Sequence, residues 1–238
     1  MHRLPAIRFL ALLALLAPAP ALAGVVLSQP TTADPDRVGL GWYSSTQPRP
    51  SHNFKHADNF TLAQPAEVAT IRWWGLSEGE FDTDLSNFDQ FTIELWSNRT
   101  PPNNRIRPDS LLNAATFALD QTDPTATGRT AANGSIEYIH EITLAQPLQL
   151  EAGVIYWLSI SARSIDPGGD VWQWQDSDDF DTLSSSFDHD LTRWLPLEDT
   201  DSAFELIAVP SPGTLAAGLA LLGFQCRRAR RRTPGVNP

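Results

Sequence analysis

The amino-acid sequence predicts an all-β fold, a single β-sandwich of the jelly-roll type. Three observations lead to this prediction. Short segments rich in β-branched and aromatic residues carry apolar side chains at alternate positions. Turns that contain proline and glycine separate these segments. No long stretch outside the two termini has the 3.6-residue apolar period of a helix, so the β-α alternation of a parallel sheet is absent.

Six to nine strands are expected along the chain. Residues 61–65 and 143–147 share the sequence Thr-Leu-Ala-Gln-Pro, and each copy is expected to end a strand and enter a proline turn. Either a half-domain has been duplicated or the same local pattern occurs twice. The flanking residues do not align, which favours the second interpretation. The clearest predicted strands are residues 57–62, 67–74, 91–96, 115–119, 136–142, 153–161, 171–175 and 204–209.

The first 23 residues have the layout of a secretory signal peptide. Arg3 and Arg8 give a basic start, and an apolar run over residues 9–16 follows. Ala21 and Ala23 then form an A-x-A cleavage site. Eight apolar residues are too few to span a bilayer, which needs roughly 20. The mature chain is therefore expected to begin near residue 24, and a retained membrane anchor is the alternative.

Residues 24–208 form the predicted exported domain, which is strongly acidic. All 28 acidic residues but only 10 of the 17 basic ones lie in it, a formal charge of −18. This charge repels phosphate backbones and excludes nucleic acid as a partner. The single cysteine, Cys226, lies outside the domain, so no disulfide can form within it. Its stability must come from an apolar core, and about 185 residues are enough to bury one.

The C-terminal residues 209–238 read as a membrane segment followed by a positive cluster. Residues 206–226 contain no charge, and a helix over 213–226 would rise about 21 Å, short of the ~30 Å hydrocarbon core. The arginines beyond it would stay cytoplasmic and leave the domain outside. This basic cluster consists of Arg227, Arg228, Arg230, Arg231 and Arg232.

This tail resembles a PEP-CTERM sorting signal, in which a proline motif, a short apolar span and an arginine cluster follow one another. Here the motif is Val209, Pro210, Ser211 and Pro212, with serine where the family usually has glutamate. The resemblance implies that an export translocase and an exosortase-type membrane peptidase act on the chain. It also implies a transient stay in the inner membrane, followed by delivery to the cell envelope or the extracellular matrix. The alternative is a permanent C-terminal anchor.

One acidic stretch is a candidate cation site. Alternating carboxylates could converge on Ca²⁺, which takes 6–8 oxygen ligands, although the stretch does not fit the EF-hand loop. The alternative is a solvated acidic loop, and the sequence indicates no other cofactor. The candidate ligands are Asp176, Asp178, Asp179 and Asp181.

Four tryptophans are candidates for stacking on sugar rings. Trp73 and Trp74 are neighbours, so they point to opposite faces if both lie in one strand. Trp172 and Trp174 share a face at period two. The alternative is that these rings fill the sandwich core, and this alternative is favoured for most of them.

Residues 75–79 fit the pattern G-x-S-x-G, in which Ser77 would be the nucleophile of a hydrolase. The motif needs a helix after the serine, but the following residues are too polar and irregular for one, so a turn is expected. The sequence therefore favours an exported, non-catalytic protein of the cell surface or extracellular matrix. A module that binds extracellular polysaccharide is the second hypothesis, and a secreted hydrolase is the third.

Overall fold

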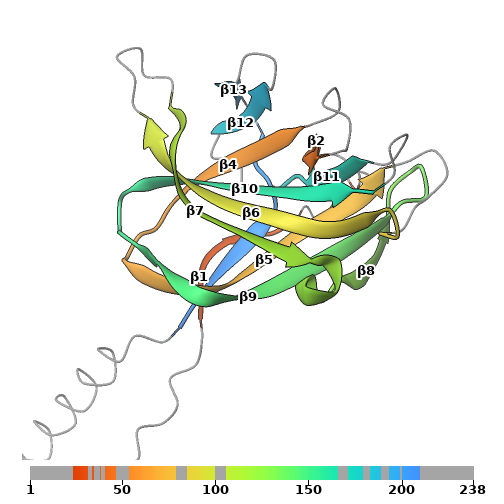
Figure 1. Cartoon of the computed structure of the whole chain (residues 1–238), viewed down its shortest axis with the longest axis horizontal. Helices are drawn as coiled ribbons and strands as arrows, with labels where there is room; N and C mark the ends of the chain where they lie inside the picture. The colour runs from red at the N-terminus through yellow and green to blue at the C-terminus, as the bar shows by residue number, and fades with distance from the viewer. Residues whose placement is uncertain are drawn as a thin grey trace, which may run out of the picture. The chain divides into compact units, whose positions relative to one another are not determined.

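The computed structural model is all-β, as the sequence predicts, and its described residues form fourteen strands in two seven-stranded sheets with a sandwich-like arrangement (Figure 1). Residues 24–208 make one compact unit. No helix among the described residues is long and apolar enough to cross a membrane. The predicted signal peptide and the predicted membrane segment lie outside those residues. The structure describes residues 24–31, 34, 38, 41–46, 54–78, 85–99, 106–165, 171–178, 183–188, 193–198 and 200–209.

The first sheet is built around β5 (Ala66–Glu78). β9 pairs with β5 along one edge, and β8 pairs with β9 beyond it. On the other edge, β14 pairs with the first part of β5 and β11 with its last part. β1 continues the sheet next to β14, and β2 continues it next to β11. These strands are β1 (Gly24–Gln29), β2 (Gly41–Tyr43), β8 (Thr125–Thr130), β9 (Ile136–Leu150), β11 (Val171–Gln175) and β14 (Phe204–Ala208).

The second sheet has the order β13-β12-β4-β10-β6-β7. The short β3 pairs in parallel with the last part of β10, beyond the part that pairs with β4. The other strand pairs of both sheets are antiparallel. These strands are β3 (Ser45–Thr46), β4 (Lys55–Thr61), β6 (Phe88–Arg99), β7 (Arg107–Ala118), β10 (Ile155–Ser164), β12 (Leu183–Asp188) and β13 (Arg193–Glu198).

The main core fills the space between the two sheets. Alternation places every second residue of β10 inward, so Tyr156, Leu158 and Ile160 all belong to this core. The first sheet contributes large aromatic residues to the same cluster. A 3₁₀-helix, η3 (Leu119–Thr122), connects β7 to β8. The largest fully buried aromatic side chains of the core are Trp73, Trp172, Trp174, Phe60, Phe91 and Phe204.

The second Thr-Leu-Ala-Gln-Pro sequence lies within β9, not at the end of a strand, and that prediction is wrong. Val68 of β5 pairs with Leu148 of β9, and Thr70 pairs with Thr143. Residues 144–147 of β9 therefore bulge out of the ladder, and Pro147, which has no N–H group to donate, lies in this bulge. The first copy does leave β4 and enter a turn before β5. The two copies have different structures, which contradicts a duplicated half-domain.

A second hydrophobic cluster covers the outer face of the second sheet. Trp157 alternates with the inward residues of β10, so it points away from the main core, yet it is fully buried. It packs with Ala57 of β4 and Trp194 of β13. β12 and β13 also contact β7, although the strand order places them at opposite edges of this sheet. The sheet therefore curls around its outer face at this end.

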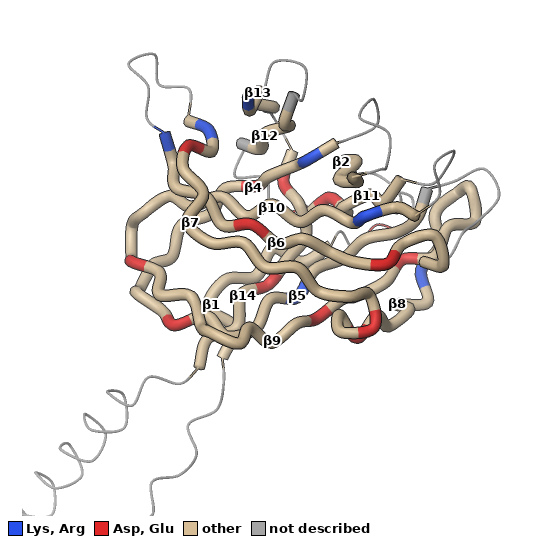
Figure 2. The backbone as a smooth tube through the Cα atoms, in the orientation of Figure 1, with Lys and Arg blue, Asp and Glu red and all other residues tan. Residues whose placement is uncertain are grey.

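The two ends of the domain lie next to each other. Gly24, the first residue of β1, is the register partner of Ala208, the last residue of β14. Figures 1 and 2 show this end of β1 and β14 on the opposite side of the domain from β12 and β13. The curled outer face is therefore far from the point where the chain enters and leaves the domain.

Candidate binding pocket

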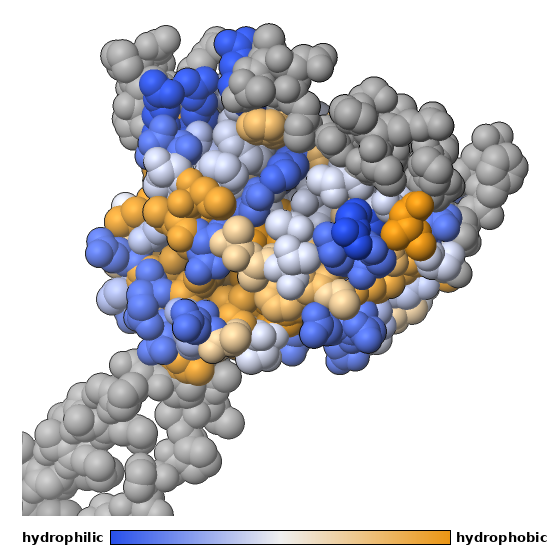
Figure 3. Space-filling model, in the orientation of Figure 1, coloured by the Kyte–Doolittle hydropathy of each residue, from blue (hydrophilic) through white to orange (hydrophobic). Residues whose placement is uncertain are grey.

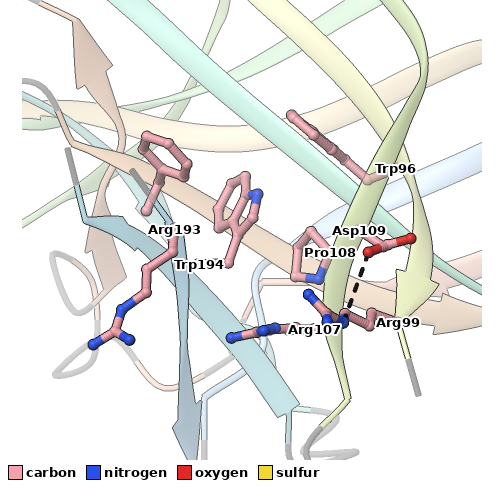
Figure 4. Close-up of a pocket in the computed structure, with 8 residues that line it drawn as sticks. Trp96, Arg99, Arg107, Pro108, Asp109, Arg193 and Trp194 are labelled. Carbon is pink, nitrogen blue, oxygen red and sulfur yellow. Dashed lines mark ion pairs between the residues drawn. The ribbon is translucent and has the colours of Figure 1, made fainter. Parts of the chain in front are cut away.

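A pocket of about 310 Å³ lies where the ends of β6 and β7 meet the β12–β13 hairpin (Figure 4). This volume is at the small end of the range for ligand sites, roughly 300–1,000 Å³. Strands from both edges of the curled sheet contribute side chains to it, so the pocket exists only in the folded sheet. The lining residues are Trp96, Arg99, Arg107, Pro108, Asp109, Phe187, Arg193 and Trp194.

Three aromatic rings form one wall of the pocket. The ring of Trp194 stands nearly perpendicular to that of Trp96, with centroids 5.7 Å apart, and to that of Phe187, with centroids 5.2 Å apart. Such edge-to-face contacts are favourable beyond the area that they bury. Trp194 is buried, and its indole nitrogen has no hydrogen-bond partner among the described residues. Trp96 is half-buried, so part of its ring is accessible from the pocket.

Polar neighbours hold two of the tryptophans on this face in place. The indole N–H of Trp96 donates to Glu94 Oε2 at 3.3 Å. Glu94 is itself fixed by Lys55, whose Nζ lies 2.7 Å from Oε1. The indole N–H of Trp157 donates to Asn98 Oδ1 at 3.1 Å. Trp96, one of the three rings of the aromatic wall, is thus held in position before any ligand enters.

The pocket gathers three arginines, two of which form no ion pair with a carboxylate among the described residues. Elsewhere in the described residues, Lys55, Arg72, Arg129 and Arg163 each form an ion pair with a carboxylate. In the pocket, by contrast, Arg99 lies 4.0 Å from Asp109, and no described carboxylate pairs with the other two arginines, Arg107 and Arg193. Figure 3 shows hydrophilic side chains gathered at this end of the molecule, above an apolar area of the same face.

Two of these arginines face each other directly across the β6–β7 ladder, because Arg99 and Arg107 are register partners. Like charges in directly opposite positions destabilise a sheet. Figure 4 shows the guanidinium group of Arg107 reaching from β7 toward β13, while the contact with Asp109 holds Arg99. An anion between the guanidinium groups would relieve this repulsion, and Arg is the side chain best suited to hold a carboxylate in two hydrogen bonds.

The four tryptophans considered as sugar platforms are in the wrong place for that role. Trp73, Trp172 and Trp174 are fully buried, and Trp74 is only 8% exposed. Trp73, Trp172 and Trp174 fill the space between the sheets, where Trp172 stands edge-to-face with Phe91. No ligand can stack on these rings in the folded domain, so the prediction of exposed rings is wrong and the core alternative is right.

The acidic stretch at the end of β11 is described only in part. Asp176 is half-buried and forms a β-bridge with Ser202, and Asp178 is exposed. Asp179 and Asp181 lie outside the described residues. Within the part of the chain that the structure describes, no group of three or more His, Cys, Asp or Glu residues is arranged to hold a metal ion.

Ser77 lies in a strand and not in a turn. Residues 75–78 continue β5 and pair with β11, and the side chain of Ser77 is fully buried. A nucleophile elbow requires an exposed serine between a strand and a helix. The structure therefore contradicts both the hydrolase motif and the predicted turn. Pairing with β11 along residues 75–78, and with β9 at residues 75 and 76, keeps this sequence extended, a tertiary effect that local patterns do not show.

Replacing Ser77 by alanine should not reduce stability. Its Oγ is buried without a hydrogen-bond partner among the described residues, so Ser77→Ala removes an unsatisfied polar atom. We expect the free energy of unfolding to stay the same or to rise by up to about 1 kcal/mol in urea titrations. Ser44→Ala is the matched control, because the buried Oγ of Ser44 donates to Ile160 O and accepts from His56 N. The control should lose about 1–3 kcal/mol, and an equal loss in both variants would contradict the assignment.

Sequence reasoning did not single out the pocket residues, although a signal was present. In β6, Trp96 occupies the same face as Glu94 and Asn98, a polar face on which a tryptophan is unexpected. Trp157 similarly shares a face with Ser159 and Ser161. Trp96 and Trp157 both belong to the second cluster, outside the main core. The sequence does not indicate that Arg193 and Trp194 lie close to these tryptophans in the fold.

Residues 26–211 match a protein family described as a domain of unknown function, DUF7901. The chain belongs to this family. All eight residues that line the pocket lie within the matched DUF7901 region. A search of curated proteins found no relative. Among solved structures, the chain resembles the crystal structure of an aminopeptidase from the marine sediment archaeon Thaumarchaeota archaeon.

The resemblance to the aminopeptidase is weak. The two share 10% sequence identity with a TM-score of 0.27 over 65% of this chain. The match spans 25% of the aminopeptidase chain. A likeness of this size carries no argument about the activity of the DUF7901 domain.

Proposed function

We propose that this chain is an exported, non-catalytic protein of the cell surface or extracellular matrix. In this proposal residues 1–23 are a signal peptide read by the export translocase, and the β-sandwich is of the jelly-roll type. A C-terminal transmembrane helix holds the protein in the inner membrane until an exosortase-type enzyme processes the tail. The observation that carries the proposal is the order of proline motif, apolar span and arginine cluster directly after the last strand.

The position of the last strand supports removal of the tail. β14 ends at Ala208, and the proline motif begins at Val209. Cleavage within the motif would therefore remove no residue of the two sheets. β14 is also held on both edges, by β1 and β5, so the end of the folded domain does not depend on the residues of the tail.

The intact mass of the protein from the envelope and the medium of its native host tests this proposal. We expect the mature protein to lack residues 1–23 and a C-terminal piece that begins near Pro210. A variant with glutamine at all five arginines of the basic cluster should keep its tail, because without these charges the apolar span is no longer fixed in the orientation in which the membrane peptidase meets the proline motif. Recovery of the unaltered protein in the membrane with Arg227 to Arg232 still attached would instead identify a permanent anchor.

The pocket favours a second function, binding of extracellular polysaccharide. The half-buried ring of Trp96 offers an apolar surface beside several hydrogen-bond donors, the combination that ligand pockets use. This function is compatible with the first, because a matrix protein acts by binding its surroundings. The site differs from the one expected at the buried tryptophans, and the proposal rests on the pocket residues alone.

A further inference from the structure

We propose that the pocket binds a carboxylate-bearing sugar unit, such as a uronic acid, of an acidic polysaccharide. Arg107, whose guanidinium group reaches toward β13, would hold the carboxylate, Arg193 would add positive charge at the rim of the pocket, and the ring of Trp96 would pack against the apolar face of the sugar. This inference rests on the polysaccharide-binding function proposed above and names the class of ligand.

The charge distribution argues for an anionic ligand. A domain of formal charge −18 repels acidic polymers over most of its surface, so any attraction must be local. Three of the seven described lysines and arginines line this one pocket, and two of them, Arg107 and Arg193, form no ion pair with a described carboxylate. The cross-strand pair Arg99 and Arg107 places two positive charges opposite each other, and Asp109 pairs only with Arg99, so Arg107 can still accept an anionic partner.

The aromatic wall argues for a sugar and not for a simple anion. A phosphate or a free carboxylate needs only donors, and the rings of Trp96, Trp194 and Phe187 would add nothing to its binding. A pyranose ring has both a polar rim and an apolar face, so it can use the donors and the ring of Trp96 together. The small volume of the pocket suits a single unit of a chain, not a long segment.

The location of the pocket suits a polymer that surrounds the cell. β12 and β13, which carry two of the three rings of the aromatic wall, lie on the side of the domain opposite to Gly24 and Ala208. A ligand can therefore reach the pocket from the side of the domain that lies opposite to its first and last residues. Arg193, on β13, is exposed there.

Calorimetric titration of the full chain in detergent with tri-galacturonate tests the inference, with the neutral trisaccharide galactotriose as the comparison. We expect tri-galacturonate to bind at least ten times more tightly than galactotriose, and its affinity to fall as sodium chloride is raised. The double variant Arg107→Gln/Arg193→Gln should lose at least tenfold in affinity. Arg163→Gln is the matched control, because Arg163 pairs with Asp89 outside the pocket, and it should bind as the unaltered protein does.

Three other results would each reject one part of the proposal: the carboxylate, the sugar ring or the binding of saccharides. Equal binding of the two trisaccharides, unaffected by the double variant, would leave polysaccharide binding in place and reject the carboxylate class. Equal binding of a short polyglutamate peptide would reject the role of the sugar ring. Absence of binding to both trisaccharides would reject the saccharide function as well, whereas the intact-mass result on export and processing is independent of all three.

Discussion

Lowering the pH from 7.5 to 5.0 is expected to reduce the free energy of unfolding by about 4 kcal/mol, through two buried histidines. His56 and His140 are at most 1% exposed, and burial lowers the pKa of each from 6.5 to about 3. His56 stacks on Trp42 with the ring planes 6° apart, and His140 stacks on Trp73 with centroids 5.2 Å apart. Neither environment can accommodate an imidazolium ion without loss of packing.

The sign of this change follows from the pH at which the folded and the unfolded chain each protonate these two histidines. Below pH 6.5 the unfolded chain protonates both histidines, while the folded chain keeps them neutral down to a pH of about 3. Their stabilising effect is complete above pH 6.5 and is lost as the pH falls from 6.5 toward 3. At pH 5.0, which is 1.5 units below the ordinary pKa, each group accounts for about 2 kcal/mol.

Urea titrations followed by tryptophan fluorescence at several pH values measure this effect. His56→Phe is the informative variant, because neither ring nitrogen of His56 has a hydrogen-bond partner among the described residues and a phenyl ring can keep the stack on Trp42. The variant should show about half of the pH dependence. A stability that does not change between pH 7.5 and 5.0 would show that these histidines are not buried as neutral groups.

Gly75→Ala is expected to destabilise the domain by about 3 kcal/mol, because a side chain at this position meets a fully buried ring. A Cβ atom on Gly75 would lie 2.3 Å from Cζ2 of Trp172, far inside contact distance. Trp172 has little freedom to move, since its ring packs edge-to-face against Phe91 with centroids 5.1 Å apart. Both strands that carry these residues are also fixed in register, with β5 paired to β11.

Thermal unfolding and urea titration of the variant measure the loss. Gly24→Ala is the matched control, because a Cβ atom there would meet nothing within 4 Å, and its stability should stay within about 0.5 kcal/mol of the unaltered protein. The double variant Gly75→Ala/Trp172→Phe should be less destabilised than the two single effects added together, because the smaller ring makes room for the methyl group. Strictly additive effects would show that the two residues do not clash.

Gly75 also shows why a short motif can mislead a prediction from sequence. In G-x-S-x-G the glycines permit a tight turn, but here Gly75 permits the ring of Trp172 to lie on β5. The sequence of residues 75–79 therefore fits both a tight nucleophile turn and an extended strand that is covered by a ring. Only the pairing of β5 with β11 distinguishes them, and that pairing joins residues about 100 positions apart.

Sequence reasoning missed six strands, β1, β2, β3, β8, β12 and β13, and two of them show why. β8 (Thr125–Thr130) and β12 (Leu183–Asp188) are rich in threonine and serine and carry little alternation of apolar residues. Their extended form comes from pairing with β9 and β4, and not from local preference. By contrast, β11 (Val171–Gln175) was predicted with the bounds that the structure shows, because its alternation is strong.

The sequence by itself determined that the domain is all-β and where its most apolar strands lie, since alternation and turn residues act locally along the chain. The tertiary structure decided which face of each strand is inward, because a second cluster covers the outer face of the second sheet and both faces of β10 carry buried tryptophan or tyrosine. The tertiary structure also determined where the pocket forms, because its lining residues come from β6 and β7 and from β12 and β13, which approach each other from opposite sides of one curled sheet. The curl depends on the packing of Trp194 against Trp96, a contact between distant residues that no local pattern encodes.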